Sequence, residues 1–289
     1  MNRFSVVFSV VLALVSGYAN AGKILVPAYF YPSANPSQSH WDELIAAASK
    51  VDITAIINPD NGSGATANND YTSAINALRG AGGKVIGYIN SSNGGRDINL
   101  VKAEIIHYTN FYSMDGFFID SMSNKSGQLP YYQDLYTYIK GLSPNYLVFG
   151  NPGTDTLESY LSVADTLMTF EGPPSSTAIN THGYDNYGVP TWMENYNSNR
   201  FGHLVYGVSD ESTMQSLIDL AASRNAGYIY ITDDILPNPW DTLPVYWNAE
   251  IAAVSILEPS SYYLFGAGLV LVTLMRPLRG SCRQISVSC

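Results

Sequence analysis

Asp115-Gly116-Phe117-Phe118-Ile119-Asp120-Ser121 is the stretch that decides the fold. Its central residues are small or apolar without alternation, which is typical of a short strand covered on both faces. Asp120 stands where this apolar run stops. In parallel barrels and doubly wound sheets, active sites lie at the carboxyl ends of the strands. Asp120 is therefore either a functional carboxylate or the N-cap of the next helix.

Strands and helices alternate along the whole chain. Apolar, partly β-branched runs predict strands at 24–28, 53–57, 84–89, 116–120, 146–149, 166–170, 203–208 and 227–232. Helical spacing predicts helices at 41–49, 71–79, 97–112, 131–142, 156–161 and 214–224, with a last one within 237–256. This repetition predicts a single (β/α)8 TIM barrel, with a doubly wound sheet as the alternative.

Three details of this pattern are open to test. Gly80 is expected to end the second helix. In the third helix, Asp97 is expected as the cap, and Leu100, Val101, Ile105 and Tyr108 are expected on one inward face. Residues 172–201 are rich in Gly, Pro, Asn and Tyr and too long for an ordinary connection, which predicts a binding loop or lid, with a short helix at 191–196.

The first 21 residues have the pattern of a secretory signal peptide. Met1-Asn2-Arg3 is a short basic start, residues 4–15 are apolar, and Ala19-Asn20-Ala21 is a small-x-small cleavage site. A membrane anchor is the alternative, but the apolar run is short for a span. We therefore expect signal peptidase to act during export, and a secreted or cell-surface protein.

The last residues, 258–289, form a second candidate sorting element. Glu258-Pro259-Ser260-Ser261 precedes an apolar stretch at 262–275, followed by Arg276 and Arg279. This order resembles the bacterial PEP-CTERM signal, which an exosortase reads and which anchors the chain transiently in the membrane. The leading Pro of that signal is replaced here by Leu257, and a frayed C-terminal helix is the alternative. The domain expected between the two ends covers residues 22–257.

Composition excludes several classes of partner. The 289-residue chain has a formal net charge of −10, which disfavours nucleic acid and anionic lipid surfaces. Both cysteines, Cys282 and Cys289, follow the expected domain, so its stability depends on its core. The 22 tyrosines suit stacking against sugar rings, although Tyr is also an ordinary core and surface residue. We expect a monomer that binds a neutral or cationic ligand.

In a barrel, the polar residues at the strand ends meet on one face. They are carboxylates, amides and phenols: Tyr29, Asn58, Tyr88, Asn90, Asp120, Asn151, Glu171, Tyr206 and Asp233. Two carboxylates across a cleft are what glycoside hydrolysis requires. For Asn58 and Asn151, each next to Pro, a role as helix cap is as well supported as a role in the site. Glu171 is not, because Gly172-Pro173-Pro174 follows it and starts no helix.

Other chemistries have little support in the sequence. His40, His107, His182 and His203 are scattered and form no HExxH spacing. Ser209 is not in a nucleophile elbow, and no P-loop or GxGxxG follows a strand. We therefore expect neither a metal nor a cofactor.

The motifs at these strand ends resemble the spherulin 4-like family of glycoside hydrolases. They include Val26-Pro27-Ala28-Tyr29-Phe30-Tyr31-Pro32, Ile57-Asn58-Pro59, Gly116-Phe117-Phe118-Ile119-Asp120, Asn151-Pro152-Gly153, Thr169-Phe170-Glu171 and Asn238-Pro239-Trp240-Asp241-Thr242-Leu243-Pro244-Val245-Tyr246-Trp247. The resemblance implies a (β/α)8 hydrolase that cleaves N-acetylgalactosamine-containing exopolysaccharide of biofilms internally. It also implies Asp120 and Glu171 as the acidic pair.

We expect Asp120 to be the nucleophile or base and Glu171 the general acid, with the other seven strand-end residues binding substrate. One departure from the resembled hydrolases bears on this. A second acid directly follows the fourth-strand Asp in those enzymes, and Ser121 stands there in this chain. The alternative is thus a catalytically weak, cell-surface carbohydrate-binding protein of the same fold.

Both ends are expected to be absent from the mature protein. A complete barrel needs no helix after Val254, and an uncleaved apolar stretch would expose a patch that soluble proteins rarely tolerate. Intact mass of the protein from its native host should match residues 22–257, and a chain ending at Leu257 should fold. A native mass that includes residues 262–289 would show that the tail is retained.

Overall fold

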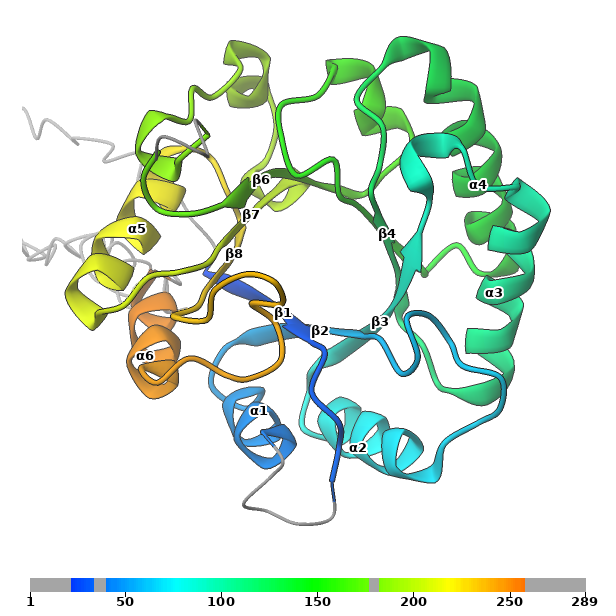
Figure 1. Ribbon diagram of the computed structural model, residues 1–289, viewed down its shortest axis with the longest axis horizontal. Coiled ribbons are helices and arrows are strands. Elements are labelled where there is room, and N and C mark those ends of the chain that lie inside the picture. Colours follow the sequence, from blue (N-terminus) through cyan, green and yellow to red (C-terminus); the bar gives the residue numbers. More distant parts are fainter. Residues whose placement is uncertain (1–21, 34–39, 177–181, 258–289) are drawn as a thin grey trace, which may run out of the picture.

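The computed structural model describes residues 22–33, 40–176 and 182–257. In these ranges, parallel strands follow chain order around a closed barrel, β1-β2-β3-β4-β5-β6-β7-β8, and helices cover its outside (Figure 1). The strands are β1 Lys23–Ala28, β2 Asp52–Ile57, β3 Lys84–Asn90, β4 Gly116–Asp120, β5 Leu147–Gly150, β6 Thr166–Gly172, β7 Phe201–Val205 and β8 Tyr228–Ile231. The predicted single (β/α)8 barrel is confirmed.

Strand pairing brings the functional ends of the strands together. β1 closes the barrel on β8, with Ile24 opposite Ile229. In the β3–β4 pair, Asn90 lies opposite Asp120, so both strands end at the same level. The strand interiors are buried because helices cover one side and the packed barrel centre covers the other, which explains their unbroken apolar runs.

Three of the described α-helices begin at residues whose side chains accept hydrogen bonds from the first turn. Asn68, Asp97 and Asp210 cap α2, α3 and α5 in this way, as expected for Asp97. The α-helices are α1 Trp41–Ala47, α2 Asn69–Gly80, α3 Ile98–Phe111, α4 Leu129–Leu142, α5 Glu211–Ser223 and α6 Trp247–Leu257.

Several sequence expectations need correction. Gly80 lies inside α2, and Ala81 is the C-cap. Leu100 is 59% exposed, because it lies in the first turn of α3, beyond the barrel surface that Val101 and Ile105 contact. The connections after β5 and β6 contain 3₁₀ turns in place of α-helices: η4 Glu158–Ser162, η5 Tyr184–Asn186, η6 Thr191–Asn195 and η7 Ser198–Arg200. Pro173, Pro174 and Pro190 make a longer helix unfavourable there.

The two ends of β4 are held in different ways. At its start, a Cβ on Gly116 would overlap the carbonyl oxygen of Leu147, so only glycine allows this close approach of β4 and β5. The Asp115 carboxylate accepts two hydrogen bonds at 3.0 Å from Arg79 and one at 2.8 Å from the Val85 amide. Asp115 therefore ties α2 and β3 to the amino end of β4.

The expected signal peptide and the whole of the expected C-terminal sorting element lie outside the described residues. The lid expected at 172–201 is described except for 177–181. Among the residues that the structure places, no helix combines the length and apolar character needed to span a membrane.

Glu250 is a buried carboxyl group in the wall between α6 and the barrel. Its Oε1 accepts a hydrogen bond of 2.9 Å from the backbone amide of Ile231, while its Oε2 has no protein partner. Burial raises the pKa of Glu250 from 4.5 to about 8, although the Ile231 hydrogen bond lowers it. Glu250 thus holds its proton in the folded protein at neutral pH.

This raised pKa predicts that the protein loses stability as the pH rises. The folded state binds the Glu250 proton more tightly than the unfolded state, so its contribution is complete below about pH 4.5 and is lost as the pH rises through about 8. The free energy of unfolding from urea titrations at pH 4.5 to 8 should fall across this window. Glu250→Gln, which stays neutral, should flatten the profile. An unchanged slope in the variant would contradict the assignment.

Candidate active site

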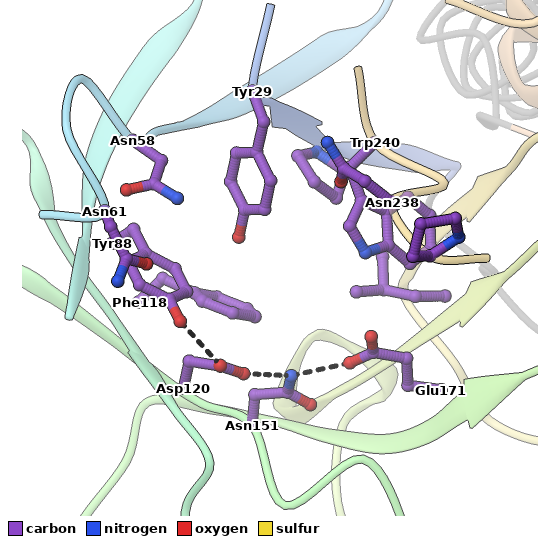
Figure 2. Close-up of a pocket in the computed structure, with 13 residues that line it drawn as sticks. Tyr29, Asn58, Asn61, Tyr88, Phe118, Asp120, Asn151, Glu171, Asn238 and Trp240 are labelled. Atoms are coloured by element: carbon purple, nitrogen blue, oxygen red, sulfur yellow. Dashed lines mark hydrogen bonds between the residues drawn. The ribbon is translucent and has the colours of Figure 1, made fainter. Parts of the chain in front are cut away.

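A cavity of about 410 Å³ opens at the carboxyl ends of the strands (Figure 2). Aromatic, amide and carboxylate side chains line it, and among the described residues no Lys or Arg does. The lining consists of Pro27, Tyr29, Asn58, Asn61, Tyr88, Phe118, Asp120, Asn151, Glu171, Leu204, Pro237, Asn238 and Trp240.

The barrel strands fix the side chains at the centre of this cavity. Tyr88 lies near the end of β3, Asp120 is the last residue of β4, and Asn151 directly follows β5. Glu171 lies within β6, one residue past the predicted strand end. Because all these strands are parallel neighbours in one barrel, their ends converge and the four side chains meet.

One amide group joins the two carboxylates. The Nδ2 of Asn151 donates to Oδ1 of Asp120 at 2.8 Å and to Oε2 of Glu171 at 2.7 Å (Figure 2). The two accepting oxygens are therefore no more than about 5.5 Å apart, the sum of those distances. The amide orientation is determined by this contact, because a flipped Asn151 would place its own oxygen against two acceptors.

Asp120 has two more hydrogen-bond donors. The Tyr88 hydroxyl donates to its Oδ2 at 3.0 Å, and the Ser121 hydroxyl does so at 3.3 Å. Ser121 adopts a left-handed backbone, with φ of 48°, and its carbonyl accepts from the Asn93 amide at 2.7 Å. These contacts orient the Asp120 carboxylate and stabilise negative charge on it. The cap interpretation of Asp120 therefore fails, since its side chain faces the cavity.

The environment of Glu171 favours the protonated acid. Burial raises its pKa from 4.5 to about 7, the Asn151 hydrogen bond lowers it, and the charge of Asp120 raises it further. Burial also raises the pKa of Tyr88 to about 12 and that of Tyr29 well above 10, so both phenols remain donors at neutral pH. The site thus holds a proton donor beside a hydrogen-bonded carboxylate.

The structure brings most of the predicted strand-end residues into the cavity lining, namely Tyr29, Asn58, Tyr88, Asp120, Asn151 and Glu171. Asn58 also braces its own turn, because its Oδ1 accepts from the Gly62 amide at 2.7 Å. The cap interpretation therefore describes part of its role. Asn151 bridges carboxylates and caps no helix.

The other three predicted residues lie outside the cavity lining. Asn90 turns toward the following backbone, where its Oδ1 accepts from the Ser92 amide at 2.7 Å. Asp233 accepts from the Val245 amide at 3.1 Å. Tyr206 packs edge-to-face on Trp240, with the ring centroids 6.1 Å apart. Each side chain supports a wall of the cavity, and its role in substrate binding stays a prediction.

Asn61, Asn238 and Trp240 line the cavity but were not predicted from the sequence. All three come from loops, which the strand-end argument does not cover. Asn61 has a left-handed φ of 47° in the Asp60-Asn61-Gly62 turn. Asn238 and Trp240 lie in the β8–α6 connection. They belong to one of the motifs that resemble the family. That motif was the signal that could have identified them.

The described residues contain no group of three or more His, Cys, Asp or Glu side chains placed to hold a metal ion. Within the 410 Å³ cavity, the titratable groups are two carboxyls and two phenols. Such a set can donate a proton from Glu171 while Asp120 attacks or stabilises an electron-poor carbon.

Comparisons with known proteins agree with this architecture. Spherulin-4 of Physarum polycephalum is 31% identical over 241 residues, which cover 82% of this chain and 71% of that protein. The crystal structure of Aspergillus clavatus Sph3 in complex with GalNAc superposes with a TM-score of 0.68 at 23% identity, covering 82% of this chain and 99% of that one. A cyclic α-maltosyl-(1→6)-maltose hydrolase from Arthrobacter globiformis gives 0.51 at 10% identity, covering 83% and 82%.

At these identities, the two solved structures show the shared barrel fold alone. The family follows from sequence. The sequence model of Spherulation-specific family 4 matches residues 23–254, from the first strand into the last helix. The chain therefore belongs to Spherulation-specific family 4.

Proposed function

We propose that this protein is an exported glycoside hydrolase that cleaves an exopolysaccharide containing N-acetylgalactosamine or galactosamine. The observation that carries the proposal is the pair of carboxyl groups bridged by Asn151, one of them with a pKa raised to about 7. The amino sugar is proposed from the likeness to Sph3, whose crystal structure contains GalNAc. A cavity without Lys or Arg among the described residues suits a neutral or cationic sugar and disfavours an acidic one.

In the proposed reaction, Glu171 donates its proton to the glycosidic oxygen while an Asp120 oxygen attacks the anomeric carbon. The bond from that carbon to the leaving oxygen breaks, and a glycosyl ester with Asp120 forms. Glu171, now a carboxylate, then takes a proton from water, which attacks the same carbon and releases Asp120. The separation of at most about 5.5 Å supports this retaining course, because inverting pairs stand about 6.5–9.5 Å apart.

Internal cleavage of a polymer is supported by two cavities that adjoin the first. Asn61 also lines a cavity of about 340 Å³ above α3, and Glu171 also lines one of about 160 Å³ beside β6. A polysaccharide could therefore continue in both directions from the carboxyl pair. This supports an endo-acting enzyme.

The alternative is a surface carbohydrate-binding protein with weak activity, and Ser121 is the feature that favours it. Ser121 gives Asp120 a hydroxyl donor at 3.3 Å where the resembled hydrolases have a second acid. Reducing-end release from a galactosamine-rich polymer separates the two functions. Polymer binding without release of reducing ends by the wild-type protein would favour the alternative.

Replacing either carboxyl group should abolish hydrolysis and leave the fold intact. Asp120→Asn and Glu171→Gln keep the side-chain shape but remove the groups that attack and donate the proton, so each should lower kcat by about 100-fold or more. Reducing-end release measures activity, and thermal unfolding measures the fold. Glu211→Gln and Asp219→Asn, two exposed positions on α5, are matched controls that should stay active.

Near wild-type turnover in both site variants would show that the pair is wrongly assigned. Proton NMR of the first product provides a separate readout in the wild-type enzyme. Retention of the anomeric configuration is expected, and an inverted first product would remove Asp120 from the role of nucleophile.

The pH dependence of kcat/KM should report the Glu171 proton. Because the protonated form is the acid, kcat/KM should fall as the pH rises through about 7. The Asn151 hydrogen bond lowers the pKa of Glu171, so Asn151→Ala should move this alkaline limb to higher pH while also lowering the maximum rate. If the alkaline limb of the kcat/KM profile stays at the same pH in Asn151→Ala, a group other than Glu171 determines that limb.

A further inference from the structure

A second cavity, of about 160 Å³, is lined by Glu171 but not by Asp120. Glu171 is a wall of both cavities, so the second one continues the first. The connections after β5 and β6 form its remaining walls. Its lining consists of Gly153, Thr154, Asp155, Phe170, Glu171, His182, Gly183, Asn186, Tyr187 and Gly188.

Among the described residues, the lining of this cavity has two carboxyl groups and one imidazole, that of His182. Asp155 and Glu171 contribute carboxyl groups, and no Lys or Arg is among the described lining residues. Burial raises the pKa of Asp155, while a hydrogen bond with Tyr187 and the proximity of His182 lower it. Because Glu171 holds a proton in the proposed reaction, Asp155 is the carboxylate of this lining that a cationic group of a ligand would face.

The position of this cavity relative to the carboxyl pair gives it a role. The proposed nucleophile, Asp120, lies under the sugar whose anomeric carbon is attacked. The proposed acid, Glu171, faces the oxygen that leaves with the next sugar. A cavity that shares Glu171 but does not contain Asp120 is therefore on the leaving-group side.

We propose that this cavity binds the leaving-group sugar and prefers a free-amino hexosamine, whose ammonium group pairs with the Asp155 carboxylate. The inference rests on the proposed glycosidase function and specifies its substrate pattern. An N-acetylated sugar has no charge at this position and gains nothing from Asp155. Tyr187, which lines the same cavity, keeps the Asp155 carboxylate hydrogen-bonded and thus oriented.

The test compares a fully N-acetylated galactosamine polymer with a partly de-N-acetylated one. The wild-type enzyme should have a higher kcat/KM on the second polymer, and its products should carry free-amino residues at their new non-reducing ends, because the leaving sugar becomes that end. Asp155→Asn should reduce the ratio of the two kcat/KM values about fivefold, as expected for one partly exposed ion pair. Activity on the fully acetylated polymer should fall much less than activity on the de-N-acetylated one.

Asp219→Asn is the matched control, since it removes the same charge from an exposed position on α5. This variant should keep the wild-type ratio of the two kcat/KM values and the free-amino residues at the new non-reducing ends of the products. Raising the salt concentration should weaken the preference of the wild-type enzyme for the partly de-N-acetylated polymer. The same change in salt should leave the preference of Asp155→Asn unaltered. In the hydrolysis-deficient Asp120→Asn background, calorimetry with a galactosamine oligomer should show weaker binding when Asp155→Asn is added.

The outcomes separate the inference from the function on which it rests. Cleavage of the acetylated polymer with no preference for free amino groups, or a preference that Asp155→Asn retains, overturns the inference and leaves the glycosidase proposal in place. Cleavage of neither polymer by the wild-type enzyme overturns both.

Discussion

The site depends on one amide nitrogen that two carboxyl groups share. Two carboxylates this close repel each other in a partly buried cavity, and the repulsion is relieved when one of them holds a proton. Asn151 donates to both, but Asp120 receives two more hydroxyl donors, from Tyr88 and Ser121. Burial and the charge of Asp120 both raise the pKa of Glu171, which reaches about 7. A neutral amide preserves this asymmetry, whereas a cation in its place would stabilise both charges and remove the acid.

Strand β4 shows how position decides what a carboxylate does. Asp115 and Asp120 flank the same four buried residues, and in the sequence only the direction of the strand distinguishes them. At the amino end, Arg79 neutralises Asp115 with two hydrogen bonds at 3.0 Å, so that group serves the fold. At the carboxyl end, Asp120 receives only neutral donors, so its charge stays available to a ligand. In a (β/α)8 barrel, residues at the amino ends of the strands stabilise the fold, and residues at the carboxyl ends form the active site.

The sequence predicted the parts of the site that strands position and missed those that loops position. Asp120, Asn151 and Glu171 were predictable, because parallel strands in one barrel must end on one face. Asn90 was assigned to the same face, but at the rim its side chain satisfies the Ser92 amide instead. Trp240 was not predicted because its place in the cavity depends on the path of a loop, which local sequence patterns do not fix. For the same reason, the irregular connections after β5 and β6 were only partly predicted.

Those connections are held by contacts that replace the missing helix packing. The Arg224 guanidinium, from just after α5, lies over the rings of Tyr184 and Tyr187, at 4.6 and 5.6 Å from their centroids. The Tyr184 hydroxyl also hydrogen-bonds the buried ring of His203 in β7 at 2.7 Å, and burial lowers the pKa of His203 to about 3, so this contact carries no charge. The wall that contains Tyr187 is thus anchored to a helix and a strand although its own backbone is irregular. This wall and the carboxyl pair are therefore coupled, because Phe170, next to Glu171 in β6, packs on the rings of Tyr184 and Tyr187, with centroid distances of 4.7 and 5.3 Å.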